Sequence, residues 1–369
     1  MLLTTKTTIE KAFLFCLFLT VSNVFAQTPK IDSLLTILKT TKNDTSKIKI
    51  LNQLGAELMN SGSGERAMQY ANEALNYCKI FLATNNHPKQ IRNNTLIEEA
   101  TSYNIIGYLY TDRGNYMDAL KNQLLSLKIR EDLGDRKGLA TSYSSIGNIY
   151  SYQANYPEAL KNYSASLKLM IENDNQRGIA ACYSNIGIIY YYQAKFPDAL
   201  KNFTASLKIM EKIGDKPGIA ASYTNIGLIY KQQGKNEEAL KNYFACLKIL
   251  QQLNDENSIA TTYFNIGAIN ILLKNFKDAR SYLNKSLLLA QQIGSKDDIK
   301  ESYNGLSNLD SVLGNWMNAY HYHLKYSAIK DSILNEDSSE AMAEMQTKYE
   351  SEKKEKEIEL QKAEISKKE

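Results

Sequence analysis

Three asparagines, Asn185, Asn225 and Asn265, stand forty residues apart in the middle of the chain. A side-chain amide both donates and accepts hydrogen bonds, so it can pair with the backbone of an extended peptide without reading its sequence. An amide ladder at constant spacing is therefore a candidate peptide clamp. The alternative is that each amide only satisfies a neighbouring helix. Ser145 and Ile105 hold the equivalent earlier positions, which confines the ladder to the middle of the chain.

A second set of candidate binding residues lies six or seven residues further along each first helix than the asparagine register. The set comprises Tyr152, Tyr191, Tyr192, Lys231 and Gln232. Tyrosine provides a large contact area at a low cost in side-chain entropy, which suits recognition of a partner. The alternative for these tyrosines is packing between neighbouring helices.

Patterns that would indicate catalysis or metal binding are lacking in the sequence. It has no Gly-rich phosphate loop, no Gly-x-Ser-x-Gly motif and no Cys/His spacing typical of a metal site. His321 and His323 are two residues apart, so on a helix they point in different directions. We therefore predict a non-enzyme without cofactor or metal. A formal net charge of +4 is too small to indicate nucleic-acid binding.

The segments that carry the candidate residues recur with a period of forty. Glycine, tyrosine and alanine each keep their own register: Gly107, Gly147, Gly187, Gly227 and Gly267; Tyr103, Tyr143, Tyr183, Tyr223, Tyr263 and Tyr303; Ala119, Ala159, Ala199, Ala239, Ala279 and Ala319. A fixed period of this size is typical of a stacked repeat array.

Each repeat splits into two patterns of helical period, separated by a short breaker such as Ala194-Lys195 or Gly234-Lys235. The second helix ends near a pair such as Gly214-Asp215. A glycine inside the first helix costs about 0.5–1 kcal/mol relative to alanine, so it needs a structural reason. We expect Gly187 to lie against Ala199, which would let the two helices approach closely.

These positions resemble the tetratricopeptide repeat (TPR), whose pattern has an aromatic, a Leu-Gly pair and a Tyr in the first helix, then an Ala and an aromatic in the second. The matching residues here are Tyr183, Ile186-Gly187, Tyr190, Ala199 and Phe203. The resemblance covers about residues 47–334 and departs from the family in its length of forty residues rather than thirty-four. It implies an all-α fold, a right-handed superhelical α-solenoid of helix hairpins, followed here by a charged C-terminal helix.

The resemblance also assigns the two helices of each hairpin to different surfaces. First helices would line a concave groove that holds the amides and tyrosines named above, and second helices would form the convex side. The first helices carry no repeated Lys or Arg, which argues against the subtype that grips a chain terminus. The second helices repeat lysines with acidic partners three residues earlier, as in Glu158 and Lys161, so we favour a solvated face with local ion pairs over a basic binding stripe.

The chain divides into five predicted segments. Residues 1–26 have the build of a secretory signal peptide, with cleavage expected after Ala26. Residues 27–46 hold a capping helix, 47–97 a divergent first repeat and 98–334 six repeats of about forty residues. Residues 335–369 are a charged helical tail, which we interpret as a truncated linker. After cleavage three cysteines remain, Cys78, Cys182 and Cys246, which do not form a disulfide framework.

We predict an exported protein, periplasmic or envelope-associated, that binds a peptide or protein segment in the concave groove and does not bind nucleic acid through this region. The alternative is the sensory region of a membrane signalling protein of the histidine kinase or transcriptional regulator type. The layout of the chain resembles exported sensors of Bacteroidetes-type bacteria, in which a membrane span and an output domain follow the repeats. A membrane tether is expected only if the chain continues beyond Glu369, and self-association is a third possibility.

Overall fold

The computed structural model describes residues 29–41, 45–84 and 87–366. The predicted signal peptide lies outside these residues. Within them the chain forms fifteen helices and no strand, which confirms the all-α prediction. None of the described helices has the length and apolar character needed to cross a membrane.

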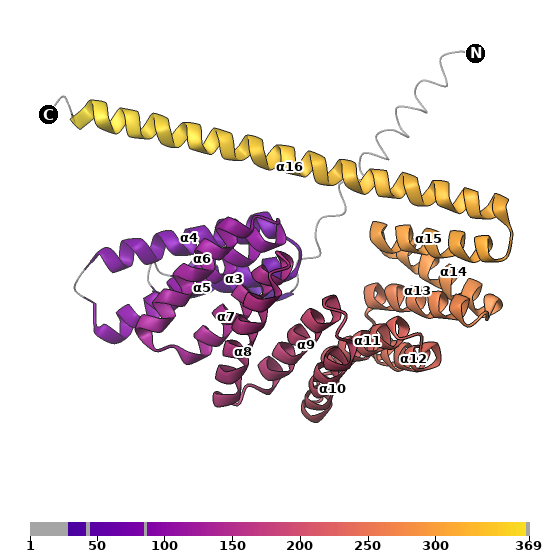
Figure 1. Cartoon of the computed structure of the whole chain (residues 1–369). Helices are drawn as coiled ribbons and strands as arrows, with labels where there is room; N and C mark the ends of the chain where they lie inside the picture. Colours follow the sequence, from indigo (N-terminus) through magenta and orange to yellow (C-terminus); the bar gives the residue numbers. More distant parts are fainter. Residues whose placement is uncertain (1–28, 42–44, 85–86, 367–369) are drawn as a thin grey trace, which may run out of the picture. The chain divides into compact units, whose positions relative to one another are not determined.

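The chain divides into two compact units, residues 1–185 and 186–369, with the boundary inside helix α9 (Gln176–Tyr192). The first unit holds α2 (Pro29–Thr40), α3 (Thr45–Asn60), α4 (Gly64–Ala83), α5 (Lys89–Asp112), α6 (Tyr116–Leu133), α7 (Arg136–Tyr152), α8 (Tyr156–Glu172) and the start of α9. Helices α3 to α8 form successive hairpins (Figure 1).

The second unit continues the same alternation from the end of α9. It contains α10 (Phe196–Ile213), α11 (Lys216–Gln232), α12 (Asn236–Leu253), α13 (Glu256–Leu272), α14 (Phe276–Ile293), α15 (Lys296–Val312) and α16 (Trp316–Ser366). Helix α16 has 51 residues and includes the second helix of the last repeat. It runs through residue 335 without a break, so the predicted tail and the last repeat share one helix.

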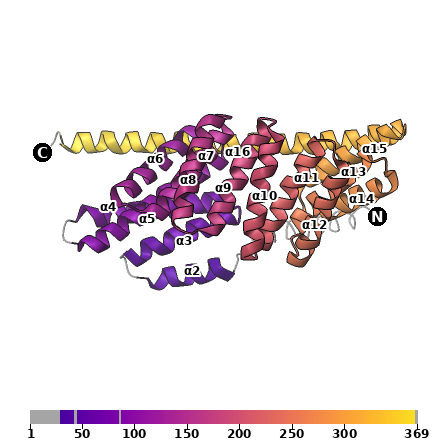
Figure 2. The same cartoon turned by 60° about the horizontal axis from the view of Figure 1, so that its bottom comes forward.

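Helix α2 covers the start of the repeats. Figure 2 shows it beside α3, on which it packs. Ile31 and Leu34 are buried in a cluster with Leu54 and Leu58 of α3. Their spacing of three residues places both side chains on one face of α2. Residues 29–40 therefore form the helix that the sequence predicted ahead of the first repeat.

The first two repeats are twelve residues further apart than one period, and the sequence places these extra residues around 82–94, with a loop at 85–88. Between α4 and α5 the structure describes Thr84, His87 and Pro88. Helix α5 starts at Lys89 and is 24 residues long. Thr95 in the added part of α5 is fully buried, and its backbone carbonyl accepts from Cys78 Sγ of α4 at 3.8 Å. Part of the twelve extra residues therefore lengthens α5, and this added part packs against α4.

The turns within hairpins depend on one residue with a left-handed backbone. Gly114, Gly234 and Gly314 take φ values of 72°, 71° and 76°, and Ala154 and Ala194 take 56° in the same place. In the turn after α9, the N–H of Lys195 donates to the carbonyl of Tyr190 at 2.9 Å, which closes the helix end. The breakers read from the sequence are confirmed as hairpin turns.

In three repeats the glycine of the first helix, Gly147, Gly187 or Gly227, has an aromatic ring as its nearest neighbour, where we expected alanine at Gly187. A Cβ added to Gly187 would lie 2.8 Å from Cε1 of Phe203, and at Gly147 it would lie 2.7 Å from Cε1 of Tyr163. Ala199 is fully buried, but it is not among the atoms nearest to this position. The prediction of close approach was right, but at Gly187 the nearest partner is the ring of Phe203 and not Ala199.

Candidate functional site

The eight predicted binding residues all lie on first helices of the hairpins. Tyr152 ends α7; Asn185, Tyr191 and Tyr192 are on α9; Asn225, Lys231 and Gln232 are on α11; Asn265 is on α13. Asn185 and Tyr152 belong to the first unit and the other six to the second. Each unit therefore has its own part of the predicted site.

In the first unit, side-chain amides link α5 to its neighbours. Asn104 Nδ2 donates to Gln123 Oε1 of α6 at 2.8 Å and to Ser145 Oγ of α7 at 3.1 Å. In return, Gln123 Nε2 donates to the backbone carbonyl of Asn104 at 3.0 Å. Gln123 is fully buried. These bonds fix the buried amide, because a buried polar group without a partner would be costly.

Asn185 takes part in a second polar cluster. Its Nδ2 donates to Asn148 Oδ1 at 3.4 Å, and the same oxygen accepts from the hydroxyl of Tyr163 at 2.7 Å. One N–H of Asn185 is thus engaged with the neighbouring first helix, which is the alternative considered for this register. The clamp function of the full ladder stays a prediction.

Tyr152 lines a small pocket on the first-helix side of the first unit. Seven residues of α5, α6 and α7 form it: Tyr108, Thr111, Asp112, Gln123, Ser145, Asn148 and Tyr152. Its volume is about 50 Å³. Tyr108 and Tyr152 line the pocket and are 45% and 67% exposed. The ring of Tyr152 is stacked on that of Tyr116, with centroids 6.2 Å apart. Amide and hydroxyl groups and the carboxylate of Asp112 thus form the lining, together with two tyrosines.

Most of this pocket was missed from the sequence, although one departure from the repeat pattern marks it. Gln123 occupies the register that holds Tyr163, Phe203, Tyr243 and Leu283 in the following repeats. An amide in place of a ring or a leucine brings a polar group into the hairpin, where it bonds to Asn104 and lines the pocket. A break in a register, rather than its repetition, is the signal that would have located the site.

The carboxylate of Asp112 acts on the pocket electrostatically. The pKa of the Tyr108 phenol is raised, first by burial and then by the negative charge of Asp112 and by Tyr152. Tyr108 therefore stays protonated at neutral pH and offers a hydroxyl donor. No lysine or arginine is among the described lining residues.

In the second unit, Tyr191 and Tyr192 have different environments. The hydroxyl of Tyr191 accepts from Gln232 Nε2 at 3.1 Å, and its half-buried ring packs on a cluster that includes Phe203 and Ile226. Tyr192 is 60% exposed and meets Tyr191 edge to face, with ring centroids 5.6 Å apart. Packing thus accounts for Tyr191, whereas most of the Tyr192 side chain lies at the surface.

Asn265 lines a separate hollow in the second unit. The hollow has a volume of about 350 Å³ and lies among α11, α12 and α13. Small side chains such as Ala221, Thr224 and Thr261 form much of it, with Cys246 among the lining residues. Asn225 is not part of this lining, and Lys231 is half-buried on α11. The hollow is consistent with a ligand along the first helices but carries little charge.

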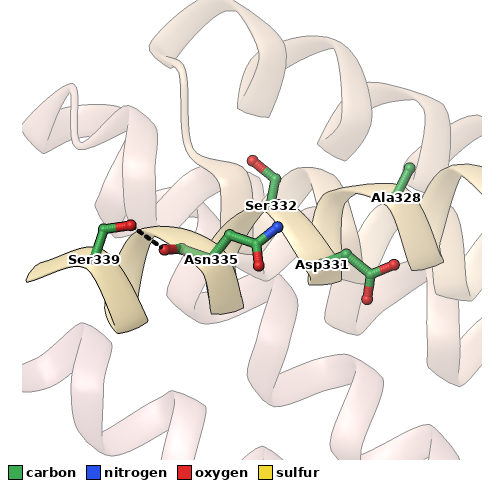
Figure 3. Close-up of a pocket in the computed structure, with 5 residues that line it drawn as sticks. All are labelled: Ala328, Asp331, Ser332, Asn335 and Ser339. Atoms are coloured by element: carbon green, nitrogen blue, oxygen red, sulfur yellow. Dashed lines mark hydrogen bonds between the residues drawn. The ribbon is translucent and has the colours of Figure 1, made fainter. Parts of the chain in front are cut away.

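A further hollow, on α16, has the character of an open helix surface. Figure 3 shows its five lining residues, Ala328, Asp331, Ser332, Asn335 and Ser339, all on α16. Ser339 Oγ donates to the backbone carbonyl of Asn335 at 2.8 Å, so this hydroxyl is used within the helix. One helix cannot enclose a ligand, and we do not assign a site here.

Nucleophilic or metal chemistry finds little support in the described residues. Cys78, Cys182 and Cys246 are buried free thiols. Burial raises the pKa of Cys78 to about 12, with a further contribution from Glu99 and Glu98. The thiolate is the reactive form of cysteine, so Cys78 is unreactive at neutral pH. No group of three or more His, Cys, Asp or Glu side chains in the described part of the chain is placed to hold a metal ion.

The helix hairpins define the chain as a helical repeat protein with a solenoid fold. More specifically, its repeats are tetratricopeptide repeats: a family model described as "Tetratricopeptide repeat" matches residues 98–172 and 178–252, and a second model of that description matches residues 260–293. A comparison of the sequence with curated proteins gives no match.

Solved structures share this fold at low sequence identity. BtubC (BKLC) from P. vanneervenii is 18% identical, with a TM-score of 0.54 over 63% of this chain and 93% of that one. A signal-transduction ATPase with numerous domains and a tetratricopeptide repeat sensor, from Pyrococcus horikoshii, is 16% identical, with a TM-score of 0.62. That match covers 79% of this chain and 44% of that chain. A Rap protein complexed with competence and sporulation factor is 12% identical, with a TM-score of 0.51 over 79% of this chain and 99% of that one.

Proposed function

We propose that the chain is a non-catalytic interaction scaffold that binds an extended peptide or protein segment along its first helices, in the concave groove expected for tetratricopeptide repeats. The observation that carries the proposal is the pocket between α5 and α7, where Tyr108 and Tyr152 are exposed beside the amides of Gln123 and Asn148. Exposed aromatic rings give contact area, and the amides pair with a peptide backbone. The Rap protein among the similar structures was solved with a bound factor, which supports a protein or peptide partner.

The binding mode is preorganised. The helices that position the tyrosines are joined by repeated buried hydrogen bonds: Ser126 Oγ donates to the carbonyl of Ala100 at 2.7 Å, and Ser166 Oγ does the same to Ala140 at 2.7 Å. A rigid scaffold lowers the entropy lost on binding. The ligand then needs to order only its own backbone.

A displayed library of random twelve-residue peptides, selected on the full chain, tests this proposal. Peptides that are enriched are synthesised, and their affinity is measured by fluorescence anisotropy. The double change Tyr108→Ala with Tyr152→Ala is expected to weaken binding at least tenfold. Tyr349→Ala is the matched control, because Tyr349 is 69% exposed on α16. Equal loss in the control, or a selection without binders, would contradict the proposal.

The asparagine ladder is tested with the same peptides. Changing Asn185, Asn225 and Asn265 together to Ala is expected to reduce affinity while the helical circular dichroism stays at the wild-type level. Because Asn185 also bonds to Asn148, Asn148→Ala is measured alongside to separate an internal effect from contact with the ligand. Wild-type affinity in the triple variant would remove the ladder from the site.

A sensory region of an exported signalling protein is the second candidate function. The observation in its favour is α16, which continues from the last repeat as one helix of 51 residues and offers a rigid connection between the repeats and whatever it adjoins. An antibody against the repeats, used on fractions of the native organism, tests this candidate and the envelope location together. A membrane-bound species well above 41.7 kDa supports it, and a free species of that mass or less opposes it.

A further inference from the structure

The pocket between α5 and α7 contains a charged residue at a position that is uncharged in the repeats that follow. Among the described residues that line it, Asp112 alone is charged. The equivalent position holds Tyr152, Tyr192 and Gln232 in the next repeats. Asp112 is exposed, and no hydrogen bond or ion pair to it is found in the described part of the chain. Its carboxylate is therefore an unpaired negative charge at the pocket.

The arginine that follows Asp112 is directed elsewhere. Arg113 Nη2 forms an ion pair with Glu65 of α4. The side chain of Arg113 is 26% exposed, and that of Glu65 is 80% exposed. Glu65 compensates the charge of Arg113, so the local balance around Asp112 stays negative. A cationic group is thus the electrostatically matched ligand.

The size and oxygen atoms of the pocket favour a compact cation. A volume of about 50 Å³ holds one to a few waters or a group of similar size, but not an aromatic ring. Thr111 Oγ1 donates to the carbonyl of Gly107 at 2.8 Å, which leaves its lone pairs as acceptors. Ser145 Oγ also lines the pocket and keeps acceptor capacity beside the bond from Asn104. An ammonium group with three donors matches such oxygens.

The two tyrosines add attraction for a cation. A ring face carries partial negative charge, so an ammonium near Tyr108 or Tyr152 is stabilised by a cation–π interaction. The stacking of Tyr152 on Tyr116, with an interplanar angle of 9°, holds that ring in place. The aliphatic stem of a lysine would cover the apolar parts of the exposed rings.

We propose that this pocket receives a lysine side chain of the bound segment, with its ammonium group at Asp112 and between Tyr108 and Tyr152. The inference rests on the proposed function, because it names the kind of segment that the scaffold selects. Recognition of one lysine would fix the position along the groove of a peptide that is otherwise bound through its backbone.

The test uses the peptides selected on the full chain. Each lysine of an enriched peptide is replaced in turn by norleucine, which removes the ammonium group and retains most of the stem. We expect one replacement to weaken binding fivefold to tenfold, the range for a partly exposed charge contact with an aromatic neighbour. Asp112→Asn should give a loss of the same size for the lysine peptide and none for the norleucine peptide. Asp112→Glu should restore most of the affinity.

Glu237→Gln is the matched control, since Glu237 is an exposed acid on the second helix α12. It removes the same charge from the chain and is expected to leave the affinity unchanged. Binders that depend on Tyr108 and Tyr152 but not on a lysine or on Asp112 would overturn the inference and leave the proposed function standing. Preference for arginine over lysine would also overturn it. A selection without binders would overturn both.

Discussion

The ring of Phe203 occupies the space that a side chain at Gly187 would need. A Cβ on Gly187 would lie 2.8 Å from Cε1 and 2.9 Å from Cδ1 of that ring. Phe203 is 3% exposed and belongs to a buried cluster, so the ring has no free space into which it can move. The ring of Phe203 therefore fits between the two helices because Gly187 has no side chain.

Gly187→Ala is expected to destabilise the protein by about 1–2 kcal/mol, because overpacking outweighs the gain in helix propensity. Gly55 offers a matched control in the same register. A Cβ there would meet Ala67 O at 3.5 Å and Ile105 Cδ1 at 3.6 Å, which are ordinary contacts. Gly55→Ala should therefore be neutral or stabilising by up to about 1 kcal/mol. Urea denaturation followed by circular dichroism measures both, and equal shifts would contradict the account.

The same register shows how far the sequence could predict the structure. Its period identified the hairpins and the need for a small residue at Gly187. The period could not show that Phe203 rather than Ala199 lies nearest to Gly187, because it says which positions are equivalent and not which side chains meet. The pocket was partly missed for a related reason. Tyr152 fitted the expected groove, but Gln123 departs from the repeat pattern on a second helix, and its bonds to Asn104 appear only once the hairpin has formed.

Two hairpin turns with equivalent geometry differ in their left-handed residue. Ala194 takes φ 56° and Gly234 takes φ 71°. Their N–H groups donate to the carbonyls of Tyr191 at 2.9 Å and Lys231 at 3.0 Å. A residue with a Cβ is strained in this region by about 1 kcal/mol relative to glycine. Ala194→Gly should therefore stabilise the second unit by about 0.5–1 kcal/mol, and Gly234→Ala should destabilise it similarly.

No atom outside the turn lies within 4 Å of a Cβ built on Gly234, so crowding cannot account for the destabilisation expected for Gly234→Ala. Thermal or urea unfolding of the two single variants measures the effects. The double variant serves as an internal check, since the two turns are separate and their effects should cancel. A loss of stability in Ala194→Gly would show that the added freedom of the unfolded chain outweighs the relief of strain.

Asp310 is expected to make the stability of the second unit depend on acidic pH. It is fully buried, and Arg280 contacts it through Nη2–Oδ1 at 2.5 Å and Nη1–Oδ2 at 3.3 Å. Burial alone would raise the pKa of Asp310, but hydrogen bonds from Arg280 and Asn315 outweigh it, and the pKa lies below its usual value of 3.8. A lowered pKa means that the carboxylate stabilises the fold above about pH 4 and that this contribution is lost as the pH falls further.

Asp310→Asn should therefore lower stability at pH 7 by about 1.5–3 kcal/mol, the range for a hydrogen bond to a charged group. Between pH 4.5 and pH 3, the variant should lose less stability than the wild type. Lys300–Asp297 provides the control, because the Asp297 side chain is 77% exposed. Asp297→Asn should change stability little at any pH. A parallel decline of Asp310→Asn and wild type on acidification would refute this role for Asp310.

Because Cys78 is buried, we expect the protein to lose stability at alkaline pH. Burial, followed by the charges of Glu99 and Glu98, raises its pKa from 9.0 to about 12. A raised thiol pKa means that the contribution to stability is complete below about pH 9 and is lost progressively toward pH 12, because only the unfolded chain ionises readily. Cys78→Ala or Cys78→Ser removes this dependence. Both variants are needed, since alanine leaves a small cavity and serine introduces a hydroxyl.

Thiol labelling supplies an independent measurement on the same residue. At pH 8 the native protein should react with a disulfide reagent at Cys78 only as fast as it unfolds locally, and labelling should follow the urea transition. Mass spectrometry of the labelled peptides distinguishes Cys78 from Cys182 and Cys246. Rapid native labelling of Cys78 would mean that its thiol is accessible and ionised, and the alkaline prediction would fail with it.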